Sequence, residues 1–117
     1  MEPKHYFLSV KIRRVDDSLP LPEYKTAGAA AMDCPIREDV EVPPKSVAMV
    51  SLNVSLKPPH GHFVLLVARS SLHKRGLMMA NSVGIGDEDF AGDADEYRAP
   101  LYNFLDEPVF IKRGTLT

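Results

Sequence analysis

Two neighbouring stretches of opposite charge in the second half of the chain could together carry phosphate chemistry. The basic stretch holds Arg69, His73, Lys74 and Arg75, and the acidic stretch holds Asp87, Glu88, Asp89, Asp93, Asp95 and Glu96. Guanidinium groups bind phosphate oxygens through paired hydrogen bonds, and carboxylates hold Mg²⁺ or its water ligands. The pattern suits a polyphosphate bound with a divalent cation, but on charge alone two ordinary solvated loops are the simpler explanation.

Small and hydroxyl residues beside these charges could shape a ligand site. Ser70 and Ser71 directly follow Arg69 and add hydroxyl and backbone donors, which commonly hold phosphate. Residues 81–87 read Asn-Ser-Val-Gly-Ile-Gly-Asp, so their backbone can approach a flat ligand closely. An ordinary β-turn explains the same two glycines equally well.

Three other residue types with potential chemistry have ordinary structural explanations. Asp33 follows an uncharged run of small residues, where an isolated aspartate is most often a turn or cap residue. Cys34 is the single cysteine, so we expect a buried small apolar residue in a reducing compartment. The four histidines, which lack zinc-site spacing, are expected to be structural or surface residues: His5, His60, His62 and His73.

The elements that must position these residues are short strands. Ten prolines and seven glycines interrupt the chain, and no long segment has the apolar period of a helix. Alternation predicts half-buried strands at 8–12 and 50–56, and the apolar run 62–68 predicts a strand buried on both faces. Further strands are expected at 40–42, 97–103 and 109–112, with one or two helical turns within 70–79. These elements predict an all-β barrel or sandwich.

Length and composition restrict the classes of function. The 117 residues fit one domain, and 44% hydrophobic residues can build its core. The net charge of −2 argues against nucleic acid or an anionic membrane as the main partner. The chain has no apolar run long enough to span a membrane and no signal-peptide centre, which predicts a cytoplasmic protein.

The order of several motifs resembles the homotrimeric dUTPase family over residues 8–114. The matching segments are 28–33, 68–71, 81–90, 102–104 and 111–114. The resemblance implies a single domain over 1–117 with a distorted jelly-roll-like β-barrel, and a homotrimer with active sites at subunit interfaces. It also implies hydrolysis of dUTP to dUMP and pyrophosphate with Mg²⁺. Family members continue into a last strand and a flexible arm, which we expect beyond Thr117.

The resemblance also assigns roles to individual residues. Asp87 matches the general base that activates water for attack on the α-phosphorus, and Phe90 matches the aromatic residue that packs on the deoxyribose. Asp33 matches the acid that holds Mg²⁺ through water. The residues matching the uracil-reading segment are Asn81, Val83, Gly84 and Ile85, and those matching the phosphate-binding motif are Arg69, Ser70 and Ser71.

Three positions depart from the family pattern. Gly86 replaces the usual Ile or Val before the base, so we expect a looser strand with less packing behind Asp87. Ala68 replaces a common proline, which leaves the strand able to continue. Residues 91–96 form a longer acidic segment, expected to be a surface hairpin.

Three alternatives to this function remain. A dCTP deaminase would share the fold and the Arg-Ser-Ser-Leu segment at 69–72, but it needs a glutamate for proton transfer where this chain has Pro100. A catalytically weak dUTP-binding regulator would keep the nucleotide site without turnover. A purely structural β-domain would bind no nucleotide.

Overall fold

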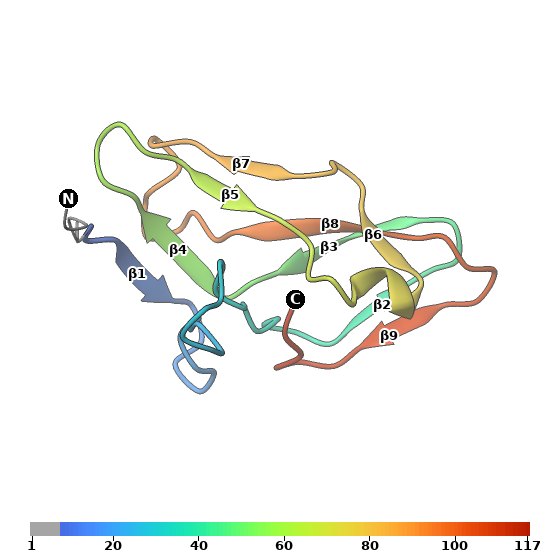
Figure 1. Ribbon diagram of the computed structural model, residues 1–117. Helices are drawn as coiled ribbons and strands as arrows, with labels where there is room; N and C mark the ends of the chain where they lie inside the picture. The colour runs from blue at the N-terminus through green and yellow to red at the C-terminus, as the bar shows by residue number, and fades with distance from the viewer. Residues whose placement is uncertain (1–7) are drawn as a thin grey trace.

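The computed structural model describes residues 8–117, which form nine short strands and one 3₁₀ helix (Figure 1). The strands are β1 (Lys11–Arg14), β2 (Val40–Val42), β3 (Val47–Ser51), β4 (Val54–Lys57), β5 (Val64–Leu66), β6 (Leu77–Met79), β7 (Gly84–Gly86), β8 (Arg98–Asn103) and β9 (Val109–Ile111). Helix η1 (Leu72–Arg75) lies between β5 and β6. The described residues therefore confirm the all-β prediction.

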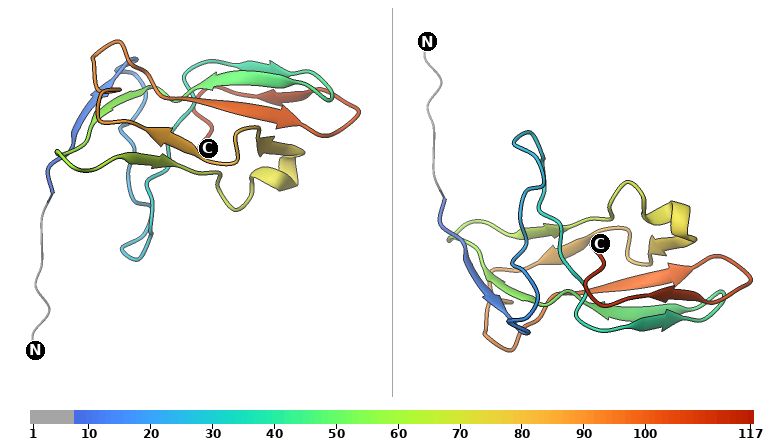
Figure 2. Two further views of the ribbon diagram at one scale, coloured as in Figure 1. Left: turned by 90° about the horizontal axis from the view of Figure 1, so that it is seen from above. Right: turned by 90° about the horizontal axis from the view of Figure 1, so that it is seen from below.

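All strand pairs are antiparallel, and most join segments far apart in the chain. Strand β1 pairs with β4, β2 with β9 and β5 with β7, while β8 lies between β3 and β6. Seen from above, β5 and β7 form one layer and β2, β3, β8 and β9 form the facing layer (Figure 2). This arrangement agrees with the barrel or sandwich predicted from the strand pattern and with the jelly-roll-like β fold that the resemblance implies.

One apolar core fills the space between the layers. Its buried members include residues of β2, β3, β4, β6, β8 and β9, and partly buried residues of β1 and β5 pack against them, so the core ties the small sheets together. No helix within residues 8–117 is long and apolar enough to cross a membrane. The largest fully buried apolar side chains are Ile36, Leu52, Leu77, Leu101, Ile111, Val42, Val50 and Val54.

The strand predicted at 50–56 is wrong as a single strand, because the chain breaks between β3 and β4. Asn53 has a φ of 68°, a left-handed conformation that interrupts the extended backbone. Its buried amide accepts a hydrogen bond from the Asp16 N–H at 2.6 Å and donates to the Asp16 carbonyl at 3.1 Å. A contact across 37 positions therefore divides a run that alternates perfectly in sequence.

The expectation that residues 62–68 form a strand buried on both faces is wrong. Strand β5 is shorter, and Phe63, Leu65 and Val67 are 61%, 56% and 43% exposed. Only the face carrying Val64 and Leu66 packs against the core. A run that is apolar on both faces thus leaves one face of this layer uncovered within a single chain.

The half-buried strand predicted at 8–12 is also displaced. Strand β1 begins at Lys11, and Leu8 and Val10 are 62% and 44% exposed. Ile12 alone continues the expected pattern and packs against the core. Two further apolar side chains are therefore left on the surface of the single chain.

The helical candidate at 70–79 is only partly correct. Helix η1 is a single short turn that ends at Gly76, whose φ of 83° suits glycine. Leu77 and Met79 then belong to β6, where both are buried against β8. Residues 84–86 form β7, whereas the sequence predicted either a β-turn or a ligand-contacting backbone segment there and no strand.

Candidate active site

Two of the predicted site residues meet directly outside the sheets. Asp33 forms an isolated bridge with Glu23, and Arg69 follows the end of β5. The Arg69 Nε lies 3.1 Å from an Asp33 carboxylate oxygen, and their side chains are 41% and 20% exposed. The pair therefore keeps both charged groups ordered and accessible to a ligand.

The two serines lie at the turn that follows Arg69. Both Ser70 and Ser71 are exposed, and the Leu72 N–H donates to the Arg69 carbonyl at 3.1 Å. Ser71 is the residue before η1, so its hydroxyl lies at the beginning of the helical turn. Asp33, its partner Arg69 and the two serines that follow Arg69 in the chain are here named the Arg69 cluster.

The predicted uracil segment borders a pocket of about 450 Å³ between the two layers. The segment turns tightly, because Ser82 has a φ of 65° and the Val83 N–H donates to the Asn81 carbonyl at 2.7 Å. A side-chain carbon at Gly84 would lie 3.2 Å from the Leu66 Cβ, so this strand approaches its neighbour closely. Lining residues from the segment and its continuation are Asn81, Gly84, Ile85, Gly86 and Phe90.

Asp87 directly follows Gly86, the last residue of β7 and part of the pocket lining. Asp87 is exposed, and its carbonyl accepts a hydrogen bond from the Phe90 N–H at 3.0 Å. The Phe90 and Tyr97 rings pack in a T-shaped arrangement, with 5.2 Å between ring centroids and an interplanar angle of 89°. The short turn therefore places a solvent-accessible carboxylate and an aromatic ring side by side.

The expected loss of packing behind Asp87 is corrected by Tyr97. A side-chain carbon built on Gly86 would collide with the Tyr97 hydroxyl and lie 2.6 Å from its Cε1 and Cζ. The tyrosine ring thus occupies the space that Ile or Val would fill from position 86. Glycine is required here by its neighbour, because any larger residue would overlap with that ring.

The Arg69 cluster and Asp87 lie at opposite ends of the β5–β7 ladder. Leu66 pairs with Gly84 and Val64 pairs with Gly86, so Arg69 follows one end and Asp87 follows the other. At about 3.3 Å per residue, this register separates Arg69 from Asp87 by roughly 15–20 Å along the strands. One chain alone does not bring the predicted base to the predicted phosphate ligands.

The family model for dUTPase matches residues 17–116 of this chain. The chain belongs to the dUTPase family. The match covers the Arg69 cluster, the pocket residues and Asp87, so every predicted site residue falls within the matched region.

Several bacterial relatives are about a third identical in sequence to this chain. The deoxyuridine 5′-triphosphate nucleotidohydrolase of Dictyoglomus turgidum is 36% identical over 112 residues, which cover 92% of this chain and 74% of the relative. That of Anaeromyxobacter is 37% identical over 111 residues, with the same two coverages. For Thermobifida fusca the identity is 35% over 116 residues, and the chain spans 63% of the relative's length.

Solved dUTPases have the same fold. The crystal structure of dUTPase from Streptococcus mutans superposes with a TM-score of 0.80 at 27% identity, covering 88% of this chain and 86% of that one. The D95N mutant dUTPase of phage phi11 of Staphylococcus aureus gives a TM-score of 0.72 at 21% identity, covering 84% of this chain and 62% of that one. The family fold predicted from the motifs is confirmed.

Sequence reasoning missed two charged contacts made by the acidic segment. Next to Asp87 in the chain, Glu88 lies 2.8 Å from His60 Nδ1, and hydrogen bonds from His60 and the Gly61 N–H lower the pKa of the Glu88 carboxyl. On the other side, Glu96 turns inward, and its side chain is only 7% exposed. No local signal marks either contact, because the partners lie 28 and 59 positions apart.

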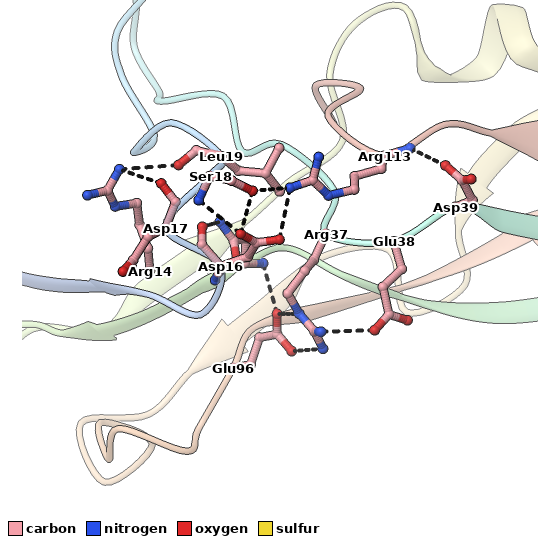
Figure 3. A network of polar contacts seen from close by, with 11 residues as sticks. Arg14, Asp16, Asp17, Ser18, Leu19, Arg37, Glu38, Asp39, Glu96 and Arg113 are labelled. Carbon is pink, nitrogen blue, oxygen red and sulfur yellow. Dashed lines mark hydrogen bonds and ion pairs between the residues drawn. The ribbon is translucent and has the colours of Figure 1, made fainter.

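Glu96 belongs to a polar network that joins the acidic segment to the core (Figure 3). The Arg37 guanidinium donates to both Glu96 carboxylate oxygens at 2.7 and 2.9 Å, and the Asn53 N–H donates to one of them at 3.0 Å. These hydrogen bonds raise the pKa of Arg37 above its ordinary value. The segment predicted as a surface hairpin therefore ends on a buried ion pair beside Tyr97.

Cys34 lies next to Asp33 and is expected to react slowly with alkylating reagents. Burial, and then the Asp33 charge, raises the pKa of the thiol to about 11. At pH 8 this leaves about 0.1% thiolate, against about 10% for a thiol with pKa 9. Iodoacetamide labelling followed by mass spectrometry should be at least tenfold slower in the native protein than in urea. Equal rates would show that the thiol is neither buried nor shielded.

Proposed function

We propose that the chain hydrolyses dUTP to dUMP and pyrophosphate. The observation that carries the proposal is the pocket of about 450 Å³ lined by Asn81, Gly84 and Phe90, with Asp87 next in sequence to the lining residue Gly86. A flat base, a sugar and an α-phosphate would follow one another along that pocket. The named bacterial relatives are nucleotidohydrolases of this substrate.

Asp87 would act as the general base. Its exposed carboxylate takes a proton from a water, whose oxygen forms a bond to the α-phosphorus. The bond from that phosphorus to the bridging oxygen breaks, and pyrophosphate leaves with the electron pair. The Gly86–Tyr97 packing behind the carboxylate would keep it in place during this step.

Selection of the nucleoside would depend on the tight turn and on Phe90. The Asn81 side chain and the backbone of Val83, Gly84 and Ile85 would hydrogen-bond the uracil edge, and the close turn would exclude a thymine methyl. The Phe90 ring offers no partner to a ribose 2′-hydroxyl. Burying that hydroxyl unpaired would disfavour UTP by about 1–3 kcal/mol.

The Arg69 cluster would bind the triphosphate together with Mg²⁺. Arg69, Ser70 and Ser71 supply donors, and Asp33 is an accessible carboxylate beside them. No group of three or more His, Cys, Asp or Glu side chains within residues 8–117 is arranged to hold a metal by itself. This donor set fits Mg²⁺ held by substrate phosphates, with Asp33 bound through water. When bound, the ion would neutralise phosphate charge.

A homotrimer would complete the site, with each site shared between chains. Arg69 and Asp87 lie at opposite ends of one ladder, so a nucleotide beside Asp87 needs the Arg69 cluster of another copy of the chain. Exposed apolar side chains on the β1 and β5 side of the molecule provide surface for such contacts. They are Leu8, Val10, Phe63, Leu65 and Val67.

The cellular setting follows from charge and the free thiol. The net charge of −2 gives no field for nucleic acid or an anionic membrane, so we propose neither as a partner. The unpaired, half-buried Cys34 is compatible with a reducing compartment, and we propose the cytoplasm.

The test is pyrophosphate release from dUTP, dCTP, dTTP and UTP with Mg²⁺, with ammonia release from dCTP measured in parallel. We expect hydrolysis of dUTP and at least tenfold slower hydrolysis of the others. Ammonia from dCTP would instead identify a deaminase, although Pro100 occupies the position of its glutamate. Tight dUTP binding without pyrophosphate would identify a regulatory member.

Shared sites predict that two inactive variants restore each other. Asp87→Asn and Arg69→Ala chains, each expected to be nearly inactive, are refolded together in equal amounts. In randomly mixed trimers about a quarter of the sites pair a native Asp87 with a native Arg69, so about a quarter of wild-type activity should return. Mixing Asp87→Asn with a chain carrying both changes is the matched control and should stay inactive. No recovery in the first mixture would show that each site lies within one chain.

A further inference from the structure

Tyr97 lines the pocket, and its hydroxyl is unpaired. The residue is 6% exposed, and its hydroxyl oxygen is buried with no hydrogen-bond partner among the described residues. A buried unpaired hydroxyl is destabilising, so it gives no reason to have tyrosine rather than phenylalanine here. The contribution of Tyr97 to the site must therefore come from its ring.

The core holds Tyr97 firmly on one side. Its N–H donates to the Val54 carbonyl at 2.8 Å, and its carbonyl accepts from the Leu52 N–H at 2.9 Å. The residue before it, Glu96, is held by the Arg37 guanidinium. These hydrogen bonds fix the backbone that carries the Tyr97 ring.

On its other side the ring touches the segment that contains the proposed base. It occupies the space of a side chain at Gly86, directly before Asp87. It also makes a T-shaped contact with the Phe90 ring, with 5.2 Å between centroids. Burial, and then the Asp87 charge, raises the pKa of the Tyr97 hydroxyl. The base and the sugar-facing ring therefore both lie against one anchored side chain.

We propose that Tyr97 is a positioning residue of the nucleotide site, which replaces the missing side chain at position 86 and sets the places of Asp87 and Phe90. The inference rests on the proposed function. Tyr97 acts through its two neighbours, so its removal should change how well the site distinguishes deoxyribose from ribose. A change that only destabilises the protein would lower both activities in the same proportion.

The experiment compares kcat/KM for dUTP and UTP in Tyr97→Val. We expect the preference for dUTP to fall about tenfold, because the Phe90 ring loses its support. Tyr97→Phe keeps the ring and should keep the preference, with a melting temperature about 2–5 °C higher since the unpaired hydroxyl is gone. Ile111→Ala, a buried change in β9, is the control for lost stability and should leave the preference unchanged.

A second pair of variants tests the steric part of the inference. Gly86→Ile alone should collide with the ring and lower the preference, whereas Gly86→Ile combined with Tyr97→Val should regain most of it. An unchanged preference in Tyr97→Val, or no recovery in the double variant, would overturn the positioning role. If the wild-type chain releases no pyrophosphate, the proposed function fails, and the same comparison is made with the binding of dUMP and UMP.

Discussion

Asp87→Asn is expected to reduce kcat for dUTP about a thousandfold, within the range typical for loss of a general base. Asparagine has nearly the same volume but cannot take a proton from water. The hydrogen bond from the Phe90 N–H goes to the Asp87 backbone carbonyl, so the substitution leaves that turn intact. Pyrophosphate release measures kcat, and titration calorimetry with dUMP should give a Kd within about threefold of wild type.

Asp89→Asn is the matched control for this prediction. Asp89 is also exposed and lies two positions further along the same acidic segment. Loss of one negative charge nearby is therefore the same in both variants, and Asp89→Asn should keep kcat within about twofold. Equal activity of Asp87→Asn and wild type would refute Asp87 as the base.

Arg37→Met is expected to lower the free energy of unfolding by about 3 kcal/mol. The change leaves the Glu96 carboxylate, whose side chain is 7% exposed, without its guanidinium partner. For a chain of this size the melting temperature should fall by roughly 10 °C, which calorimetry at fixed protein concentration would measure. Because Glu96 precedes Tyr97, the pocket should also lose order.

Two companion variants separate the buried contact from the exposed one. Arg37 also pairs with Glu38 at 2.9 Å, but the Glu38 side chain is 64% exposed. Glu38→Gln should therefore change stability by less than about 0.5 kcal/mol. Replacing both Arg37 and Glu96 by methionine should recover part of the loss, since the unpaired buried charge is then gone but the Asn53 N–H loses its acceptor. A large effect of Glu38→Gln with a small one for Arg37→Met would reverse this assignment.

Strand positions could be predicted where local alternation and breakers agree. Strands β2, β8 and β9 lie close to the predicted 40–42, 97–103 and 109–112. The break between β3 and β4 could not be, because Asn53 takes its conformation from hydrogen bonds to Asp16. The exposed face of β5 was also beyond local reasoning, since an apolar run looks the same whether the chain itself or another surface covers it.

The site was predictable in content but not in arrangement. Charge composition was only compatible with a polyphosphate, whereas the motif order identified the family that the later match confirmed. The meeting of Asp33 with Arg69 and the separation of Arg69 from Asp87 depend on strand register, which single-residue patterns do not encode. The same limit hid the fit between Gly86 and Tyr97, which lie on different strands or their ends.

The fit between Gly86 and Tyr97 also limits which single substitutions this chain can accept. A branched residue at 86 would overlap with the Tyr97 ring, so that change is blocked while the tyrosine is present. Replacing Tyr97 by a smaller residue would leave a cavity beside Gly86, which is the milder defect. A path to a branched residue at 86 therefore passes through loss of the tyrosine first. The two positions depend on each other, and their packing fixes the order in which they can change.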